Sequence, residues 1–146
     1  MTTQQDYLPS PTAWVRNAVE KIESSGSTEP AGFDGRKVVL MTMRGASTGK
    51  LRKVPVMRVE HDGRYAAVAS HGGGPKNPVW YYNLRADPRV RLQDGTVVHD
   101  LIARELAGEE RDVWWERSVA AFPTYADYEI KTARLIPVFL LEPAAR

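Results

Sequence analysis

The chain has 146 residues, 42% of them hydrophobic, which is enough for one domain, residues 1–146, to bury a core without metal or disulfide support. It contains no cysteine, which excludes disulfide bonds, thiolate metal sites and a cysteine nucleophile. The 20 basic residues against 18 acidic ones leave a net charge of +2, too small to predict a nucleic acid as partner. The first residues lack the features of a signal peptide, and no apolar run approaches the roughly 18 residues of a spanning helix, so we expect a cytoplasmic protein.

Residues 1–35 are predicted to form an N-terminal extension that carries an amphipathic helix. Ser10-Pro11-Thr12 is typical of a helix start, and Gly26 marks the end. The apolar residues between them recur at three- and four-residue spacing: Trp14, Val15, Ala18, Val19 and Ile22. The charges along the helix alternate in sign and lack the Lys/Arg excess of a membrane-surface helix. We therefore favour packing on the core, with weak peripheral contact to the inner face of the cell membrane as the alternative.

From residue 36 onward, short segments rich in β-formers predict a sheet. Five strands are expected in 36–44, 52–60, 64–70, 89–94 and 96–107, and a sixth, buried strand in 134–143. Asp94-Gly95 is typical of a two-residue hairpin with a type I′ turn. The pattern favours an α+β domain built on a closed or nearly closed barrel of about six mostly antiparallel strands with flanking helices.

Two helices are predicted between the fifth and sixth strands. Residues 108–122 have helical spacing, and a shorter helix is expected in 124–133. The residues of the first helix predicted to face inward are Val113, Trp114, Val119, Ala120 and Phe122.

The turn GASTGK, Gly45 to Lys50, resembles a phosphate-binding P-loop only superficially. It has three residues between its glycines instead of four, and Leu51 follows the lysine where the motif needs Ser or Thr. A strand follows the turn, and the motif requires a helix there. Arg44, Arg52 and neighbouring lysines predict either an anion-binding turn or a solvated hairpin tip.

The stretch SHGGGPKNPVWYYNL, residues 70–84, joins three glycines to a wall of aromatic residues. The glycines allow a flat ligand to approach the main chain. Asn77 and Pro78 predict a helix start, with Asn77 as the cap. Trp80, Tyr81 and Tyr82 cannot all face one way on a helix, so one or two of them are expected in the core. A glycine-rich loop followed by an ordinary packing helix is the alternative interpretation.

Three stretches carry a resemblance to a known family: TMRGASTGKLRKVPV (42–56), VASHGGGPKNPVWYYNLRADPRV (68–90) and FPTYADYEIKTARLIPVFLLEP (122–143). The specific parts are KNPxWYxNL and YxxYxxxT. The chain resembles the deazaflavin-dependent nitroreductase family of actinobacteria, the coenzyme F(420)-dependent quinone and nitro reductases, from Val38 to Pro143. The resemblance implies a split β-barrel of the FMN-binding type and the 8-hydroxy-5-deazaflavin coenzyme F(420) as cofactor.

The resemblance also implies a set of cofactor-binding residues. The coenzyme's ring would lie on the loop 69–72, its phosphate on the turn 45–50 and the strand after it, and its acidic tail along Lys50, Lys53 and Lys76. The implied residues are Ser47, Thr48, Lys50, Arg52, Pro55, Ala69, Ser70, His71, Gly72, Lys76, Asn77, Trp80 and Asn83.

The chain departs from the family pattern at four places. Ala46-Ser47 stands where an Arg-Lys pair is frequent, and His71 stands where lysine is frequent. Phe122 and Met57 replace tyrosines of the family's nitro-drug reducers. The acceptor range is therefore the property that the resemblance fixes least.

The implied activity is hydride transfer from reduced coenzyme F(420) to a quinone, a nitroaromatic compound or an activated alkene. Oriented donors would stabilise the negative charge that develops on the acceptor, and Ser70, Tyr125 and Tyr128 are the candidates for this catalytic role. The two tyrosines are three residues apart, so a helix places both on one face. Ordinary packing of both rings is the alternative interpretation.

Two other functions stay open at this point: an oxidoreductase that binds FMN in the same type of barrel, and a non-catalytic protein that binds or carries the deazaflavin. No metal site is predicted, because His61, His71 and His99 lack ligand spacing.

Overall fold

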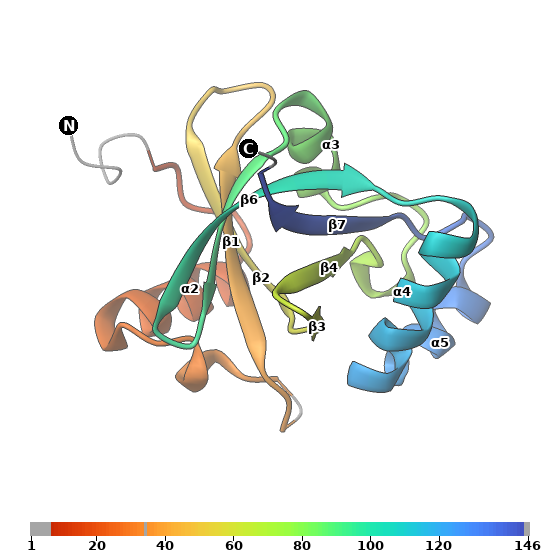
Figure 1. Ribbon diagram of the computed structural model, residues 1–146. Helices are drawn as coiled ribbons and strands as arrows, with labels where there is room; N and C mark the ends of the chain where they lie inside the picture. Colours follow the sequence, from red (N-terminus) through yellow and green to blue (C-terminus); the bar gives the residue numbers. More distant parts are fainter. Residues whose placement is uncertain (1–6, 34, 145–146) are drawn as a thin grey trace.

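The computed structural model describes residues 7–33 and 35–144. Within them, the chain forms a strongly curled antiparallel sheet of seven strands, in the order β2-β1-β5-β6-β7-β4-β3 (Figure 1). The strands are β1 (Val38–Arg44), β2 (Leu51–Met57), β3 (Glu60–His61), β4 (Arg64–Val68), β5 (Arg89–Asp94), β6 (Val97–Glu105) and β7 (Val138–Pro143). The helices are α2 (Ala13–Ser25), η1 (Glu29–Ala31), η2 (His71–Gly73), α3 (Val79–Ala86), α4 (Gly108–Ala121) and α5 (Thr124–Lys131). The predicted α+β class is confirmed.

The chain crosses from one edge of the sheet to the other in two residues. β2 and β3 are the edge strands, and only Arg58 and Val59 separate them. The amide of Arg58 donates to the carbonyl of Lys37 beside β1 (3.0 Å), while the carbonyl of Val59 accepts from the amide of Ala66 in β4 (2.9 Å). The single strand predicted over 52–60 is therefore divided by a corner, which gives seven strands where six were predicted.

Asp94, at the end of β5, stabilises this corner. Its carboxylate accepts hydrogen bonds from Nε of Arg58 (2.9 Å to each oxygen) and from the hydroxyl of Tyr65 (2.6 Å). Burial, together with the hydrogen bond to Asp94, raises the pKa of Tyr65, so its hydroxyl stays protonated and remains a donor. One acidic side chain thus joins the corner, β4 and β5.

The β5–β6 hairpin turn differs from the prediction in type. The β5–β6 turn forms as predicted, but its two central residues are Gly95 and Thr96, since Asp94 pairs with Val97. Gly95 has φ 62° and Thr96 has no positive φ, which is typical of type II′. The type I′ geometry occurs instead between β3 and β4, where Asp62 and Gly63 have φ 54° and 76°.

Helix α2 packs on the outer face of β1. Val15, Val19 and Ile22 are buried against Leu40, so the predicted amphipathic helix uses its apolar stripe on the sheet. Trp14 was predicted to belong to this stripe, but 63% of it is exposed. Residues on a helix advance by 100° each, which turns Trp14 away from the stripe that begins at Val15.

Helices α4 and α5 cover the side of the sheet formed by β4 and β7 (Figure 1). Trp114 packs on β7, but Val113 is 46% exposed and Ala120 is exposed, so the predicted inward face was partly wrong. The buried stripe of α4 contains Arg111 and Ser118, which no apolar pattern reveals. Both are polar groups with backbone partners: Arg111 donates to the carbonyl of Ile136, and Ser118 donates to the carbonyl of Trp114.

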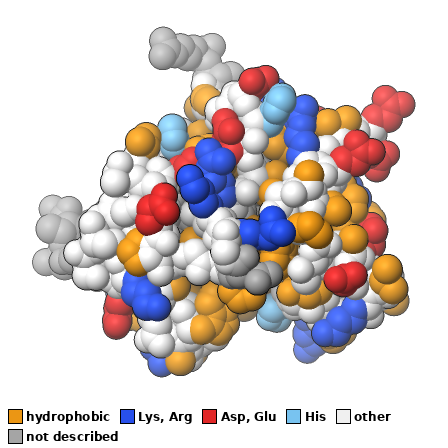
Figure 2. All heavy atoms as spheres, turned by 90° about the horizontal axis from the view of Figure 1, so that it is seen from below, with side chains coloured by type: hydrophobic (Ala, Val, Ile, Leu, Met, Phe, Trp, Pro, Cys, Tyr) orange, Lys and Arg blue, Asp and Glu red, His pale blue; other side chains and the backbone are white. Residues whose placement is uncertain are grey.

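Basic and acidic side chains are interspersed over the face of the molecule seen in Figure 2, with apolar side chains between them. Among residues 7–33 and 35–144, no helix is both long enough and apolar enough to cross a bilayer.

Candidate functional site

The turn between β1 and β2 is held in a fixed shape by its own backbone and by helix α3. The amide of Gly45 donates to the carbonyl of Lys50 (2.7 Å), and the amide of Gly49 donates to the carbonyl of Gly45 (2.9 Å). The amide of Ala46 donates to Oδ1 of Asn83 (2.9 Å), a residue of α3 that is only 5% exposed. We call Gly45–Lys50 together with Arg52 the cationic turn.

The sequence-predicted residues around this turn lie on different faces of the sheet. Arg52 pairs with Met43 and therefore lies on the barrel-interior face of β2, together with Val54. Lys53 and Pro55 lie on the opposite face, toward α2. Ser47, Thr48 and Lys50 are exposed at the tip.

Arg52 and Lys53 differ in whether an acidic side chain of the protein pairs with them. Nζ of Lys53 lies 2.6 Å from the carboxylate of Glu23 in α2, so its charge is already compensated within the chain. Among the residues that the structure describes, Arg52 makes no ion pair. Arg52 is therefore the better candidate of the two for an external anion.

The loop after β4 presents backbone in place of side chains. His71, Gly72 and Gly73 have φ values of 48°, 63° and 76°, which place all three residues in the left-handed region. At Gly72 an added Cβ would meet nothing within 4 Å, so this part of the loop faces open space. Ser70 is 8% exposed and begins the same turn. We call Ser70–Gly72 the glycine ledge.

Gly73 is the place where helix α5 contacts the loop. A Cβ at this position would lie 3.2 Å from Cα of Tyr128 and 3.1 Å from Cδ of Lys131. The structure thus brings Tyr128 beside the glycine ledge, as the sequence-based assignment of both to one site requires. At Gly73, the group that approaches the backbone closely is helix α5 of the protein itself.

Replacing Gly73 by alanine is expected to lower the free energy of unfolding by about 2–5 kcal/mol. The left-handed φ costs about 1–2 kcal/mol with a side chain present, and forcing α5 outward costs about 1–3 kcal/mol more. Gly72→Ala is the matched control, because its φ is similar but its surroundings are open. Urea denaturation measures both variants, and equal losses would contradict the close packing of α5 on Gly73.

Arg134, which was not predicted from the sequence, connects the two ends of this loop by hydrogen bonds. Its guanidinium donates to the carbonyls of Ala69 (3.2 Å), Ser70 (2.7 Å) and Gly74 (3.0 Å) and to Oδ1 of Asn77 (2.6 Å). The partners lie 57–65 residues away in the chain, so no spacing in the sequence could have indicated this contact. Burial of the guanidinium lowers the pKa of Arg134.

Asn77 and Trp80 differ in role from the sequence-based expectation. Asn77 does not cap α3: the residue before the helix is Pro78, and no side chain caps the first turn. The Asn77 side chain accepts from Arg134 instead. Trp80 is 8% exposed and packs with Tyr81 against Phe139 in the barrel core, while Tyr82 is 53% exposed. The expectation that one or two of the three aromatic residues are core is confirmed.

Of the remaining predicted residues of the loop, His71 and Lys76 are at the surface and Ala69 is buried. His71 and Lys76 are exposed, and Nδ1 of His71 lies 3.1 Å from the carbonyl of Lys76, which folds the imidazole back along the loop. Ala69 is fully buried and bonds the carbonyl of Pro137 through its amide (2.9 Å), which extends the β4–β7 pairing up to the start of the glycine ledge.

The two candidate tyrosines lie in one aromatic cluster. Tyr125 and Tyr128 have ring centroids 6.3 Å apart, and both contact Phe122. Tyr125 is only 4% exposed, and burial raises its pKa, so its hydroxyl stays protonated. Tyr128 is half-buried and is the more accessible donor of the two. Met57 packs against the same cluster.

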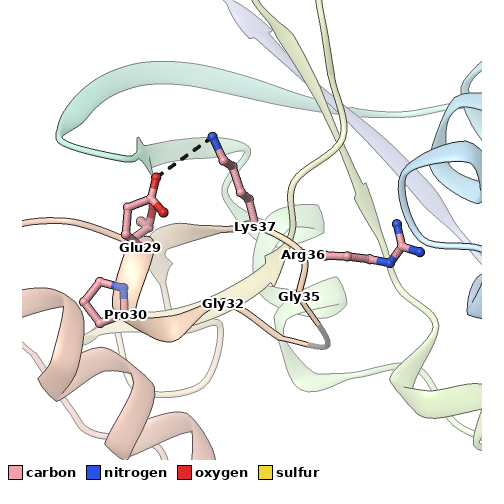
Figure 3. A pocket seen from close by; sticks show the side chains of 7 residues that line it. Glu29, Pro30, Gly32, Gly35, Arg36 and Lys37 are labelled. Atoms are coloured by element: carbon pink, nitrogen blue, oxygen red, sulfur yellow. Dashed lines mark ion pairs between the residues drawn. The ribbon is translucent and has the colours of Figure 1, made fainter.

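Two surface pockets lie outside the glycine ledge, and the second of them borders the cationic turn through Arg44 and Leu51. One, of 330 Å³, is lined by Thr28, Glu29, Pro30, Gly32, Gly35, Arg36 and Lys37. Figure 3 shows Lys37 paired with Glu29 (3.9 Å) and Arg36 pointing away from the pocket, where it bonds the carbonyl of Ala121 (3.0 Å). A second pocket, of 440 Å³, lies between β1, β5 and β6, and in it Arg89 pairs with Asp87 and Arg91 with Asp100. In both, most of the charge is compensated within the chain.

Within residues 7–33 and 35–144, no three His, Asp or Glu side chains come together as a metal site would require. The residues present do fit a flat anionic cofactor. At Gly72 the glycine ledge offers backbone without a side chain, and the cationic turn offers an arginine without an ion pair among the described residues. Helix α3 joins the two, because it follows the loop and its Asn83 holds the turn.

Comparison with known proteins identifies the family of this chain. The family model described as F(420)H(2)-dependent quinone reductase matches residues 14–143. The F(420)H(2)-dependent quinone reductase Rv1261c of Mycobacterium tuberculosis is 30% identical over 106 residues, which cover 70% of this chain and 71% of that protein. A solved F(420)-H(2) dependent reductase, FDR-A, is 57% identical with a TM-score of 0.69 and covers 72% of this chain and 93% of its own. A solved structure described as a domain-swapped dimer is 53% identical with a TM-score of 0.72, covering 91% and 100%.

These similarities confirm three predictions made from the sequence: the split-barrel fold, the oxidoreductase activity with a small molecule as acceptor, and coenzyme F(420) as the cofactor. The chain belongs to the F(420)H(2)-dependent quinone reductase family.

Proposed function

We propose that this protein transfers a hydride from reduced coenzyme F(420) to a quinone, a nitroaromatic compound or an activated alkene, at the glycine ledge beside the cationic turn. The observation that carries the proposal is the shared anchor of these two elements. Helix α3 follows the loop that contains the ledge, and Asn83 of α3 accepts the amide of Ala46 in the turn. A ligand with a flat ring and a phosphate would contact both elements at once.

Each group of residues has a distinct task in the proposed site. The amides and side chains of Ser47 and Thr48, with Arg52, hold the phosphate. The loop from Ala69 to Gly72 supports the ring, with Lys76, Asn77, Trp80 and Asn83 around it. Pro55 and Trp80 act through packing, because the side chains of both are buried. Lys50 and Lys76 remain exposed for the acidic tail, while Lys53 is paired with Glu23.

Reduced coenzyme F(420), when bound there, supplies the hydride. The chain's own residues orient the acceptor, exclude water and stabilise the charge that develops on an acceptor oxygen. Tyr128 and Ser70 are the proposed hydrogen-bond donors, since Ser70 belongs to the ledge and Tyr128 lies beside Gly73 at its end. Tyr125 shapes the acceptor site from beneath through its contacts with Phe122 and Tyr128.

We assign the activity to the cytoplasm and to one split-barrel domain, residues 1–146, with residues 1–35 as an N-terminal extension. Residues 1–6, residue 34 and residues 145–146 lie outside the described part of the chain. In the described part of the extension, Trp14 is 63% exposed on α2. Its ring is the proposed contact with the inner face of the membrane, where apolar quinones dissolve.

The proposal is tested by mixing the purified protein with reduced coenzyme F(420) and menadione and following the absorbance of the oxidised coenzyme. A nitrofuran and an enone serve as parallel acceptors, and separate titrations compare coenzyme F(420) with FMN. We expect coenzyme F(420) to bind and to be oxidised by at least menadione. Binding without oxidation by any of the three acceptors would favour a carrier, and binding of FMN alone would favour a flavin oxidoreductase.

A further inference from the structure

Arg134 contacts the backbone of the glycine ledge on the side of its carbonyl groups. Its bonds to the carbonyls of Ala69 and Ser70 fix the direction of two consecutive peptide groups. In a planar trans peptide, the carbonyl and the next residue's N–H point in opposite directions. The amides of Ser70 and His71 therefore point away from Arg134.

The backbone angles place these amides side by side. Ser70 has right-handed helical angles (φ −75°, ψ −34°) and His71 is left-handed (φ 48°). A right-handed residue followed by a left-handed one makes a concave nest of successive N–H groups that accepts an anionic or carbonyl oxygen. Among the described residues, neither the amide of Ser70 nor that of His71 has a hydrogen-bond acceptor.

The same guanidinium also bonds the far end of the loop. The carbonyl of Gly74 and Oδ1 of Asn77 accept its other two hydrogen bonds, and Thr132, just after α5, contacts the Gly74 carbonyl through its hydroxyl (3.4 Å). One planar side chain thus closes a loop that contains three left-handed residues. A lysine has only three donors on a single nitrogen and cannot make this fan of bonds in one plane.

We propose that Arg134 is a positioning residue that holds the amides of Ser70 and His71 as a two-donor site for an oxygen of the cofactor ring or of the acceptor. The inference rests on the proposed function, because it assigns the ligand to the glycine ledge. Arg134 itself touches neither cofactor nor acceptor. It acts by turning the loop carbonyls inward, so that the donors face the reacting groups at no cost in reorganisation.

The test compares the wild type with Arg134→Lys and with Arg64→Lys, a control at the opposite end of β4 whose side chain is exposed and pairs with Glu142. Amide NMR spectra are recorded on addition of oxidised coenzyme F(420), and kcat and KM are measured with the reduced coenzyme and menadione. In the wild type and in Arg64→Lys, the amide protons of Ser70 and His71 are expected to move downfield. In Arg134→Lys these shifts should fall to less than half, with kcat about tenfold lower and KM for menadione unchanged.

Four outcomes are distinguishable. Wild-type shifts and kcat in a folded Arg134→Lys would overturn the role of Arg134 and leave the proposed function standing. Cofactor binding to the wild type without shifts at Ser70 and His71 would overturn the two-donor site. Absence of binding to the wild type would overturn both the inference and the proposed function. If Arg134→Lys fails to fold, Asn77→Ala removes one of the four bonds, and unchanged shifts at Ser70 and His71 in that variant would contradict the proposal.

Discussion

Arg52→Ala is expected to weaken the binding of coenzyme F(420) by about ten- to hundredfold. A hydrogen bond to a charged group contributes about 1.5–3 kcal/mol, and every 1.4 kcal/mol is a factor of ten in affinity. Arg52 lies on the interior face of β2, opposite Met43, and makes no ion pair among the described residues. Its removal therefore deletes a charge available to the ligand without leaving a partner unpaired. Fluorescence titration with the oxidised coenzyme gives the dissociation constants.

Lys53→Ala is the matched control for this experiment. Lys53 is the next residue in the same strand, but its ammonium bonds Glu23 and faces α2. We expect the affinity of Lys53→Ala to stay within about twofold of the wild type, with a loss of stability of about 1–3 kcal/mol, because the Lys53 side chain is largely buried and its removal leaves Glu23 unpaired. If the two variants bind alike, Arg52 is not part of the anion site.

Asn83→Ala is expected to weaken cofactor binding by about tenfold and to lower the free energy of unfolding by about 1–3 kcal/mol. The change removes the acceptor of the Ala46 amide and leaves a partly buried donor unpaired. The cationic turn then loses its link to α3 and no longer keeps a fixed position relative to the glycine ledge. Urea denaturation and the same fluorescence titration measure the two effects separately.

Gln93→Ala separates the local effect from a general loss of stability. Gln93 also bonds backbone through its side-chain amide, to the carbonyls of Gly26 and Gly95, but near the β5–β6 hairpin. Its replacement should destabilise the protein while leaving the affinity for coenzyme F(420) unchanged. Equal losses of affinity in Asn83→Ala and Gln93→Ala would show that Asn83 has no specific role in the site.

The sheet could be predicted from the sequence because its signals are local. β-Branched and aromatic runs separated by glycine turns indicated six of the seven strands. The division of residues 52–60 was missed because the corner at Arg58 depends on Asp94, which is 36 residues away. The inward residues of α4 were partly missed for a similar reason. Buried Arg111 donates a hydrogen bond to the carbonyl of Ile136, 25 residues away in the chain, and stacks on the ring of Trp115.

In the candidate site, too, the features with local signals were predicted and those that depend on long-range contacts were missed. The turn and the glycine-rich loop were recognisable by their own residues, and the family resemblance joined them into one site. Arg134 was missed because all its partners come from a distant loop, and the sequence assigned it to the start of a strand. Asn77 was given a capping role from its position before Pro78, but the nearby guanidinium competes for the same side-chain oxygen.

The position of coenzyme F(420) in a crystal of this protein tests the account most directly. We expect the ring over the amides of Ser70 and His71, with its phosphate within hydrogen-bond distance of Arg52 and the turn 45–50. A ring in the pocket beside Lys37, or in the pocket between β1, β5 and β6, would contradict the assignment of the glycine ledge as the site of hydride transfer.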